Sequence, residues 1–208
     1  LTLSEPHRER EPWRIQWPRV PREILGGFAR VSLTAATVWA TVALFLSIVP
    51  LYAESFGETR NLAVLAAVAA LALLASAATQ VVAQRRNPSV RLSQAVGLTI
   101  LASGLVLLVL AAPLRSLGLV VAGSLAAGIG HGLGFLNAQQ ELNEIAPGER
   151  RGEVTSAFIA CIYALVATAV IGTGLLDEWF SLSVSVGTVA IGLVLCALAG
   201  AGWQAVDQ

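Results

Sequence analysis

The chain alternates between long apolar stretches and short polar ones. The uncharged stretch between Arg30 and Glu54 holds 23 residues, and the one between Arg115 and Glu141 holds 25. A helix that rises 1.5 Å per residue needs about 20 residues to cross about 30 Å of hydrocarbon. Because lipid offers no hydrogen-bond partner to an open backbone, each stretch is predicted to be a membrane-spanning helix.

This pattern predicts an all-α membrane protein with six transmembrane helices. Residues 1–25 are predicted to be a basic cytoplasmic linker, since they carry four prolines that prevent a long helix. An amphipathic segment at the membrane interface is the alternative for this region, because Trp13 and Trp17 lie among arginines. Residues 26–206 form the six-helix unit, with spans predicted at about residues 28–52, 62–83, 92–112, 117–139, 154–176 and 182–203.

Composition supports the same class. The chain is 56% hydrophobic and 12% charged, whereas an ordinary soluble domain carries about 25% charged residues. The bilayer is therefore the expected partner, and neither a nucleic acid nor a cofactor is expected. Cys161 and Cys196 both lie inside predicted spans, where they are interpreted as packing residues and not as a disulfide or metal pair.

The positive charges predict an orientation. All 13 basic residues are arginine. Ten of them precede the first span or lie between spans two and three or four and five, whereas only Arg60 and Arg115 lie in the opposite connections. The positive-inside rule then places both termini in the cytoplasm. Arg30, at the start of span one, is expected to extend toward the interface.

Span four differs from the others because it is rich in glycine. Gly128 and Gly132 form one small-xxx-small pair, and Gly130 and Gly134 form another. Such pairs favour close helix packing, and a flexible gating helix beside a cavity is the alternative. His131 lies among them, and an ionisable residue at this depth is a candidate for substrate or proton binding. A neutral histidine bonded to a neighbouring carbonyl is the other possibility.

Further polar residues inside the spans are candidates for a substrate cavity. Spans one and five carry threonines, a tryptophan and a tyrosine within apolar sequence, and Tyr163 is either a packing ring or a cavity donor. Pro50 is expected to kink or end span one. The predicted cavity residues are Thr37, Trp39, Thr41, His131, Asn137 and Tyr163.

The charged connections are candidates for gating. After span four, Glu141 or Glu144 is expected to pair with Arg150 or Arg151 across a loop broken by Pro147. An exposed pair of this kind contributes only about 0–1 kcal/mol, unless it opens and closes with a conformational change. The predicted gating residues are Arg85, Arg86, Glu141, Pro147, Arg150 and Arg151.

Residues 128–176 resemble a segment of the major facilitator superfamily. The glycine-rich helix, the A-P-x-x-R loop with Pro147 and Arg150, and the helix with Tyr163 are similar to spans ten and eleven of bacterial efflux-type members. The motif covers about 50 residues, and the six-span topology extends the resemblance to the whole chain. In the loop after span two, where members often have G-x-x-x-D-R-x-G-R-R, Gln80 and Gln84 replace the glycine and the aspartate and only arginines remain.

The resemblance implies a fold and a function. It implies two inverted three-helix repeats, with spans one and four lining a cavity, spans two and five forming the moving interface, and spans three and six facing lipid. It implies a secondary transporter in the inner membrane, an antiporter that exports small molecules with a proton gradient. A further six-helix N-terminal half, in the same chain or in a partner, is expected to complete the cavity.

Two other classes were weighed against transport. An intramembrane protease needs a serine motif or a His-Glu-x-x-His metal site, and the chain has neither. An enzyme is therefore not expected. A non-transporting six-helix subunit, which is truncated or requires a partner, has the same sequence pattern as a transporter and stays open as the alternative.

Overall fold

A computed structural model describes residues 19–55, 61–86 and 89–206 of the chain. Six long helices account for most of them, and each is long and apolar enough to cross a membrane. Two short 3-10 turns, η1 (Arg22–Ile24) and η2 (Gly148–Arg150), precede α1 and α5. The helices are α1 (Leu25–Ser55), α2 (Leu62–Arg86), α3 (Val90–Leu114), α4 (Leu117–Ile145), α5 (Arg151–Asp177) and α6 (Leu182–Val206). The all-α, six-span prediction is confirmed.

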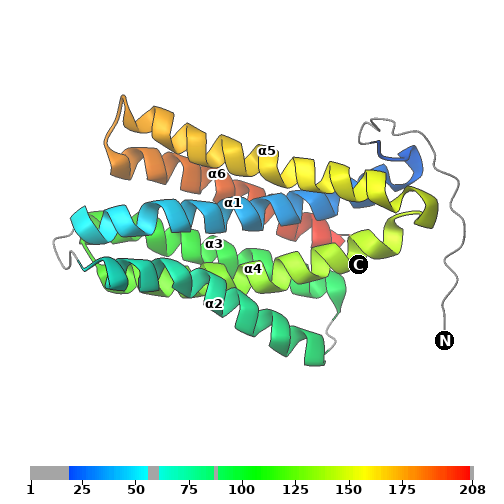
Figure 1. The fold of residues 1–208 in the computed structure, drawn as a ribbon, viewed down its shortest axis with the longest axis horizontal. Coiled ribbons are helices and arrows are strands. Elements are labelled where there is room, and N and C mark those ends of the chain that lie inside the picture. Colours follow the sequence, from blue (N-terminus) through cyan, green and yellow to red (C-terminus); the bar gives the residue numbers. More distant parts are fainter. Residues whose placement is uncertain (1–18, 56–60, 87–88, 207–208) are drawn as a thin grey trace, which may run out of the picture.

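The helices run alternately up and down in one bundle (Figure 1). The starts of α1, α3 and α5 and the ends of α2, α4 and α6 lie at one end of it. We call this the basic end, because it carries eight of the nine described arginines, all except Arg115.

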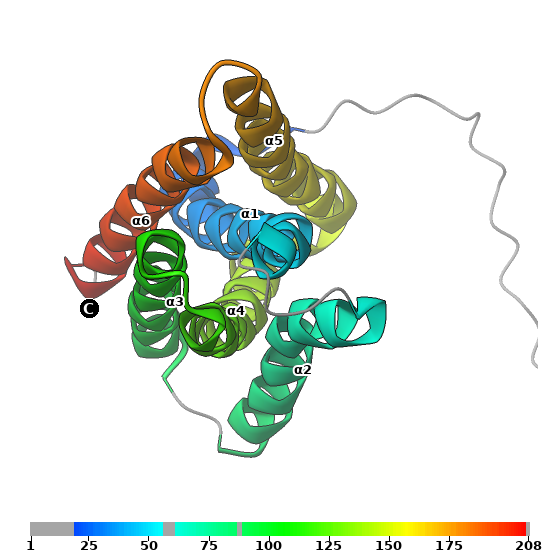
Figure 2. The same ribbon diagram turned by 90° about the vertical axis from the view of Figure 1, so that its left-hand side faces the viewer.

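Helix α1 forms the centre of the bundle, with the other helices around it (Figure 2). Of its apolar segment 72% is buried, compared with 22% for α5. The six helices divide into two three-helix repeats, α1–α3 and α4–α6. The second helix of each repeat packs on the first helix of the other repeat, α2 on α4 and α5 on α1. Because α1 and α4 run in opposite directions, this exchange is the arrangement that inverted repeats require.

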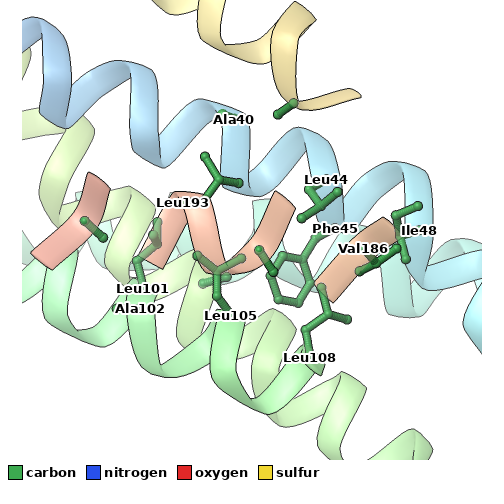
Figure 3. Packing of buried hydrophobic residues seen from close by; sticks show 14 of the residues in the cluster. Ala40, Leu44, Phe45, Ile48, Leu101, Ala102, Leu105, Leu108, Val186 and Leu193 are labelled. Carbon is green, nitrogen blue, oxygen red and sulfur yellow. The ribbon is translucent and has the colours of Figure 1, made fainter. Parts of the chain in front are cut away.

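Apolar side chains from all six helices form the main core, and most of them come from α1, α3 and α6 (Figure 3). Leu44 and Phe45 of α1 meet Leu101 and Leu105 of α3, with Val186 and Leu193 of α6 beside them. A second core cluster lies between α1, α4 and α5 and includes Phe28, Leu142 and Phe158. The two clusters hold α3, α4 and α6 against α1, and they leave much of α2 and α5 exposed.

The helix bounds decide two local expectations. Of the two outcomes expected at Pro50, an end of the helix is not found, since α1 continues to Ser55. Helix α4 continues to Ile145 and not only to Gln139, so Glu141 lies on a helix and not in a loop. The helix ends at Ile145 because Ala146 precedes Pro147 and is extended, as a residue before proline usually is.

The glycines of α4 are used for close approach to three neighbours. A Cβ on Gly128 or on Gly132 would collide with the α2 backbone at Ala72 and Ser76. A Cβ on Gly130 would collide with the α3 backbone at Gly97. The first small-xxx-small pair therefore faces one helix, α2, as such a pair should. The second pair is divided, because Gly134 faces Val38 of α1.

Candidate functional site

A cavity of about 410 Å³ opens between α1, α4 and α5. Its apolar wall includes Phe135, Leu142 and Phe158, which also belong to the second core cluster or pack against it. Its polar groups are Trp39, Gln139, Asn143, Thr155 and Tyr163. None of the described charged residues lines it, so the cavity suits an apolar or amphipathic molecule that needs few hydrogen bonds.

Tyr163 is the most accessible of the large apolar side chains in this wall. Its side chain is 68% exposed although it lies in the middle of a membrane-spanning helix. Trp39 lies on the opposite wall, on α1, and is half-buried. Two of the six predicted cavity residues therefore line the cavity, and both combine a large apolar ring with one hydrogen-bonding group.

His131 lies behind this wall and is 3% exposed. Its ring meets the edge of Trp39 with centroids 4.9 Å apart and stacks on Phe135 at 5.6 Å. Its Nδ1 is 2.7 Å from the hydroxyl of Ser76 on α2, which also accepts a hydrogen bond from Gln80. Among the described residues its Nε2 has no hydrogen-bond partner. A substrate or proton role for His131 stays a prediction.

The remaining predicted cavity residues are placed in helix packing. Thr37 and Thr41 are fully buried on α1, and the Thr41 hydroxyl donates to the Thr37 carbonyl. Asn137 is buried on α4 and its amide donates to the Leu133 carbonyl. None of these three lines the cavity between α1, α4 and α5.

A buried polar network at the basic end joins four helices. Arg30 of α1 forms an ion pair with Glu141 of α4, and both side chains are almost inaccessible to solvent. Gln94 of α3 donates to the second carboxylate oxygen of Glu141 at 2.6 Å. Gln204 of α6 donates to Gln94 at 2.8 Å and to Thr34 at 3.3 Å. Both Glu141 oxygens are therefore occupied, as a buried carboxylate requires.

This network corrects two predictions. Arg30 was expected to extend outward, and it turns into the bundle instead. Glu141 or Glu144 was expected to pair with Arg150 or Arg151. Instead Glu141 pairs with Arg30, and Arg150 pairs with Glu153. The reason is the longer α4, which carries Glu141 on the helix face toward α1 and α3. Arg91 also approaches Glu141, at 3.6 Å.

The remaining predicted gating residues lie outside this network. Arg150 forms a local ion pair with Glu153 at 2.8 Å, and Arg151 donates to the Asn143 carbonyl at 3.4 Å. Pro147 precedes η2 and marks the break between α4 and α5. Arg85 and Arg86 are exposed at the end of α2.

Sequence reasoning missed several residues of the site and of the network. Gln139 and Asn143 line the cavity, whereas Gln94 and Gln204 complete the network. Each lies near the end of an apolar span, where a polar residue is ordinary, so its type alone carries little signal. A single glutamine on an otherwise apolar helix face, as at Gln94 and Gln204, is the sequence feature that would have predicted a buried polar contact.

In the described part of the chain, no three His, Cys, Asp or Glu side chains lie close enough together to bind a metal ion. Cys161 is exposed on α5 and Cys196 is half-buried on α6, both as free thiols. The polar groups that line the cavity are aromatic side chains with one hydrogen-bonding group each, side-chain amides and hydroxyls. These groups bind by contact and by hydrogen bonds, without an assembled nucleophile and base.

The sequence matches the family model described as Major Facilitator Superfamily over residues 3–170. The match covers the first four helices and most of α5. No curated protein and no solved structure matched the chain.

Proposed function

The chain belongs to the major facilitator superfamily of membrane transporters, and from this we propose that it is one half of a secondary active transporter that exports small molecules by alternating access. The observation that carries the proposal is the open cavity between α1, α4 and α5. Two of its three wall helices, α1 and α4, are the first helices of the two three-helix repeats, and transporters with inverted repeats form their substrate sites between such repeats.

The lining of the cavity supports a class of substrate. Apolar groups dominate, and aromatic rings at Trp39, Phe135 and Tyr163 face a few amide and hydroxyl groups. A site of this composition favours amphipathic organic molecules with flat or aromatic parts. The absence of a lining charge among the described residues argues against a strongly charged sugar phosphate or dicarboxylate as the principal substrate.

The exposure of the cavity supports a second unit across from it. Leu46, Ile159 and Tyr163 are all exposed on this wall. Lipid would satisfy the aliphatic side chains, but it would offer no hydrogen-bond partner to the Tyr163 hydroxyl in the middle of α5. A second six-helix unit, in the same chain or in a partner, would enclose the cavity in protein and water.

Orientation and coupling complete the proposal. The basic end is assigned to the cytoplasm of an inner membrane, since the arginines gather there. The coupling ion is proposed to be the proton. His131 is the candidate carrier within this half, because its ionisable ring packs against a cavity residue, Trp39. A non-transporting subunit is the alternative function.

Labelling of single cysteines tests the cavity without knowledge of the substrate. In a background with Cys161→Ser and Cys196→Ser, Tyr163→Cys should react with a membrane-impermeant maleimide in intact vesicles. The matched control is Leu198→Cys, which is exposed on α6 outside the cavity and should face lipid. Equal, slow labelling at both positions would show that the cavity faces lipid, and the proposal would fail.

Transport itself is tested with a flat aromatic cation. Inverted vesicles that contain the full natural protein should accumulate ethidium when an inward-acid proton gradient is imposed. Ile159→Trp, which fills the cavity, should reduce the initial rate at least tenfold, whereas Leu198→Trp should leave it unchanged. A water-accessible cavity without gradient-driven transport of ethidium or of other amphipathic probes would favour the non-transporting alternative.

A further inference from the structure

A second opening lies on a different side of the bundle, between α2 and α3 at the basic end. Its volume is about 300 Å³. Helix α2 packs on α1 and α4, and the end of α2 and the start of α3 both lie at this end of the bundle (Figure 1). The α4 side chain Leu133 forms the base of the groove. The groove shares no lining residue with the cavity between α1, α4 and α5.

The walls of the groove are apolar and accessible from the side of the bundle. Val82 of α2 is 51% exposed, and Leu92 and Val96 of α3 are also exposed. Ala83 and Leu133 extend the apolar surface inward. In a bilayer, a lateral apolar groove of this kind is in contact with acyl chains, since water does not reach it.

The mouth of the groove is basic. Arg86, the last residue of α2, lines the mouth, and Arg85 is its neighbour in the chain. Both are exposed, and neither makes an ion pair or a side-chain hydrogen bond within the described ranges. The Ser93 hydroxyl lies in the same lining and adds a donor. Within the part of the chain that the structure describes, no acidic residue lines the groove, so none of its described lining residues neutralises the Arg86 guanidinium.

We propose that this groove binds an anionic phospholipid, with one acyl chain between α2 and α3 and the phosphate at Arg86. The apolar part of the groove matches the acyl chain of such a lipid, and the cation at its mouth matches the anionic headgroup. Basic pockets between transmembrane helices bind anionic headgroups in this manner, and a planar guanidinium pairs with phosphate through two parallel hydrogen bonds. Ser93 then donates to a headgroup or ester oxygen.

Four other arginines of the basic end, Arg30, Arg91, Arg150 and Arg151, do not form an equivalent site. Arg150 is paired with Glu153, and Arg30 and Arg91 approach Glu141. Arg151 is exposed at the start of α5 and does not line the groove. Arg151 therefore serves as a matched control, because its removal changes the charge of the same end by the same amount without touching the groove.

The test uses the full natural protein, delipidated in detergent and titrated with phosphatidylglycerol or phosphatidylethanolamine, with bound lipid counted by native mass spectrometry. The wild type should retain phosphatidylglycerol in preference to phosphatidylethanolamine. Arg86→Gln should weaken phosphatidylglycerol binding about fivefold, the factor that corresponds to one cation at a membrane surface. Arg151→Gln should have no effect. Equal losses in both variants would show a diffuse charge effect and overturn the proposal.

A second variant tests the acyl-chain slot while every charge is kept. Val96→Phe places a ring in the groove and should abolish the preference for phosphatidylglycerol, whereas Val184→Phe on α6 should not. Inorganic phosphate at millimolar concentration should not displace the lipid, since it gains nothing from the slot. Displacement by phosphate, or full retention of the lipid in Val96→Phe, would contradict a phospholipid site.

Discussion

The two sides of α4 differ in how closely they approach their neighbours. Toward α2 and α3, the helix presents Gly128, Gly130 and Gly132, and backbone meets backbone with no room for a methyl group. Toward α5, it presents Phe135, Gln139 and Asn143, and a cavity of about 410 Å³ remains. One helix therefore carries a closed contact and an open wall.

This difference shows how a transporter half can be rigid and still hold a binding space. Close packing holds α4 to α2 and α3 through dispersion contacts, which are the main attraction between helices in lipid. The buried network adds a polar contact at the end of the same packed side, at Glu141. The open side carries no such tie, and α5 is mostly exposed. Substitutions on the two sides should therefore differ in kind.

The largest effect is expected for Glu141→Gln on the packed side. The substitution removes the carboxylate that neutralises the buried Arg30, and breaking a buried pair costs about 3–5 kcal/mol. Unfolding in detergent mixtures should show this loss, whereas Glu144→Gln, one turn along and exposed, should change stability by less than about 0.5 kcal/mol. An Arg30→Leu, Glu141→Leu double variant should recover much of the loss. If Glu141→Gln and Glu144→Gln were equally stable, the buried network would not contribute to the stability of the bundle.

Gly130→Val should produce the next largest effect. Its Cβ would collide with the α3 backbone at Gly97, and overpacking costs about 1–3 kcal/mol. The matched control is Gly174→Val on α5, where nothing lies within 4 Å of an added Cβ. The midpoint of thermal unfolding in detergent should fall for the first variant only. A similar fall in both would indicate that the loss comes from the glycine itself and not from the contact.

Ser76→Ala should lower stability less than the two substitutions on the packed side, and more than a substitution on the open side. It removes the hydroxyl that bonds His131 Nδ1, a contact of about 1 kcal/mol. Ser103→Ala, an exposed serine that bonds only its own helix, is the control. If His131 binds protons or substrate, Ser76→Ala should also shift the pH profile of transport, whereas Ser103→Ala should not. An unchanged stability and pH profile would assign Ser76 no influence on His131.

Tyr163→Phe on the open side should have the smallest effect on stability, below about 0.5 kcal/mol, because the side chain is 68% exposed. Its effect should fall on transport instead, through the apparent KM, since the hydroxyl is one of few donors in the cavity. Unfolding and initial rates measured on the same preparation separate the two. A clear loss of stability would place Tyr163 in a protein contact and not in a binding space.

Much of the fold could be predicted, and much of the site could not. The six spans follow from runs of uncharged residues, because a polar backbone in hydrocarbon must form helices. Trp39 and Tyr163 were predicted and line the cavity. Thr37, Thr41 and Asn137 were predicted for the same reason, polarity inside a span, and they lie in helix packing. Polarity alone does not distinguish a residue that bonds its own helix from one that faces a cavity.

The sequence by itself determined the class of protein, the number of helices and the family to which the chain belongs, since each depends on local composition or on a contiguous motif. Only the tertiary structure decided that Arg30 pairs with Glu141, 111 positions away. It also decided which glycines meet a backbone and which meet nothing. The physical reason is that a helix has several faces, and the neighbour that each face meets depends on how all six helices pack together.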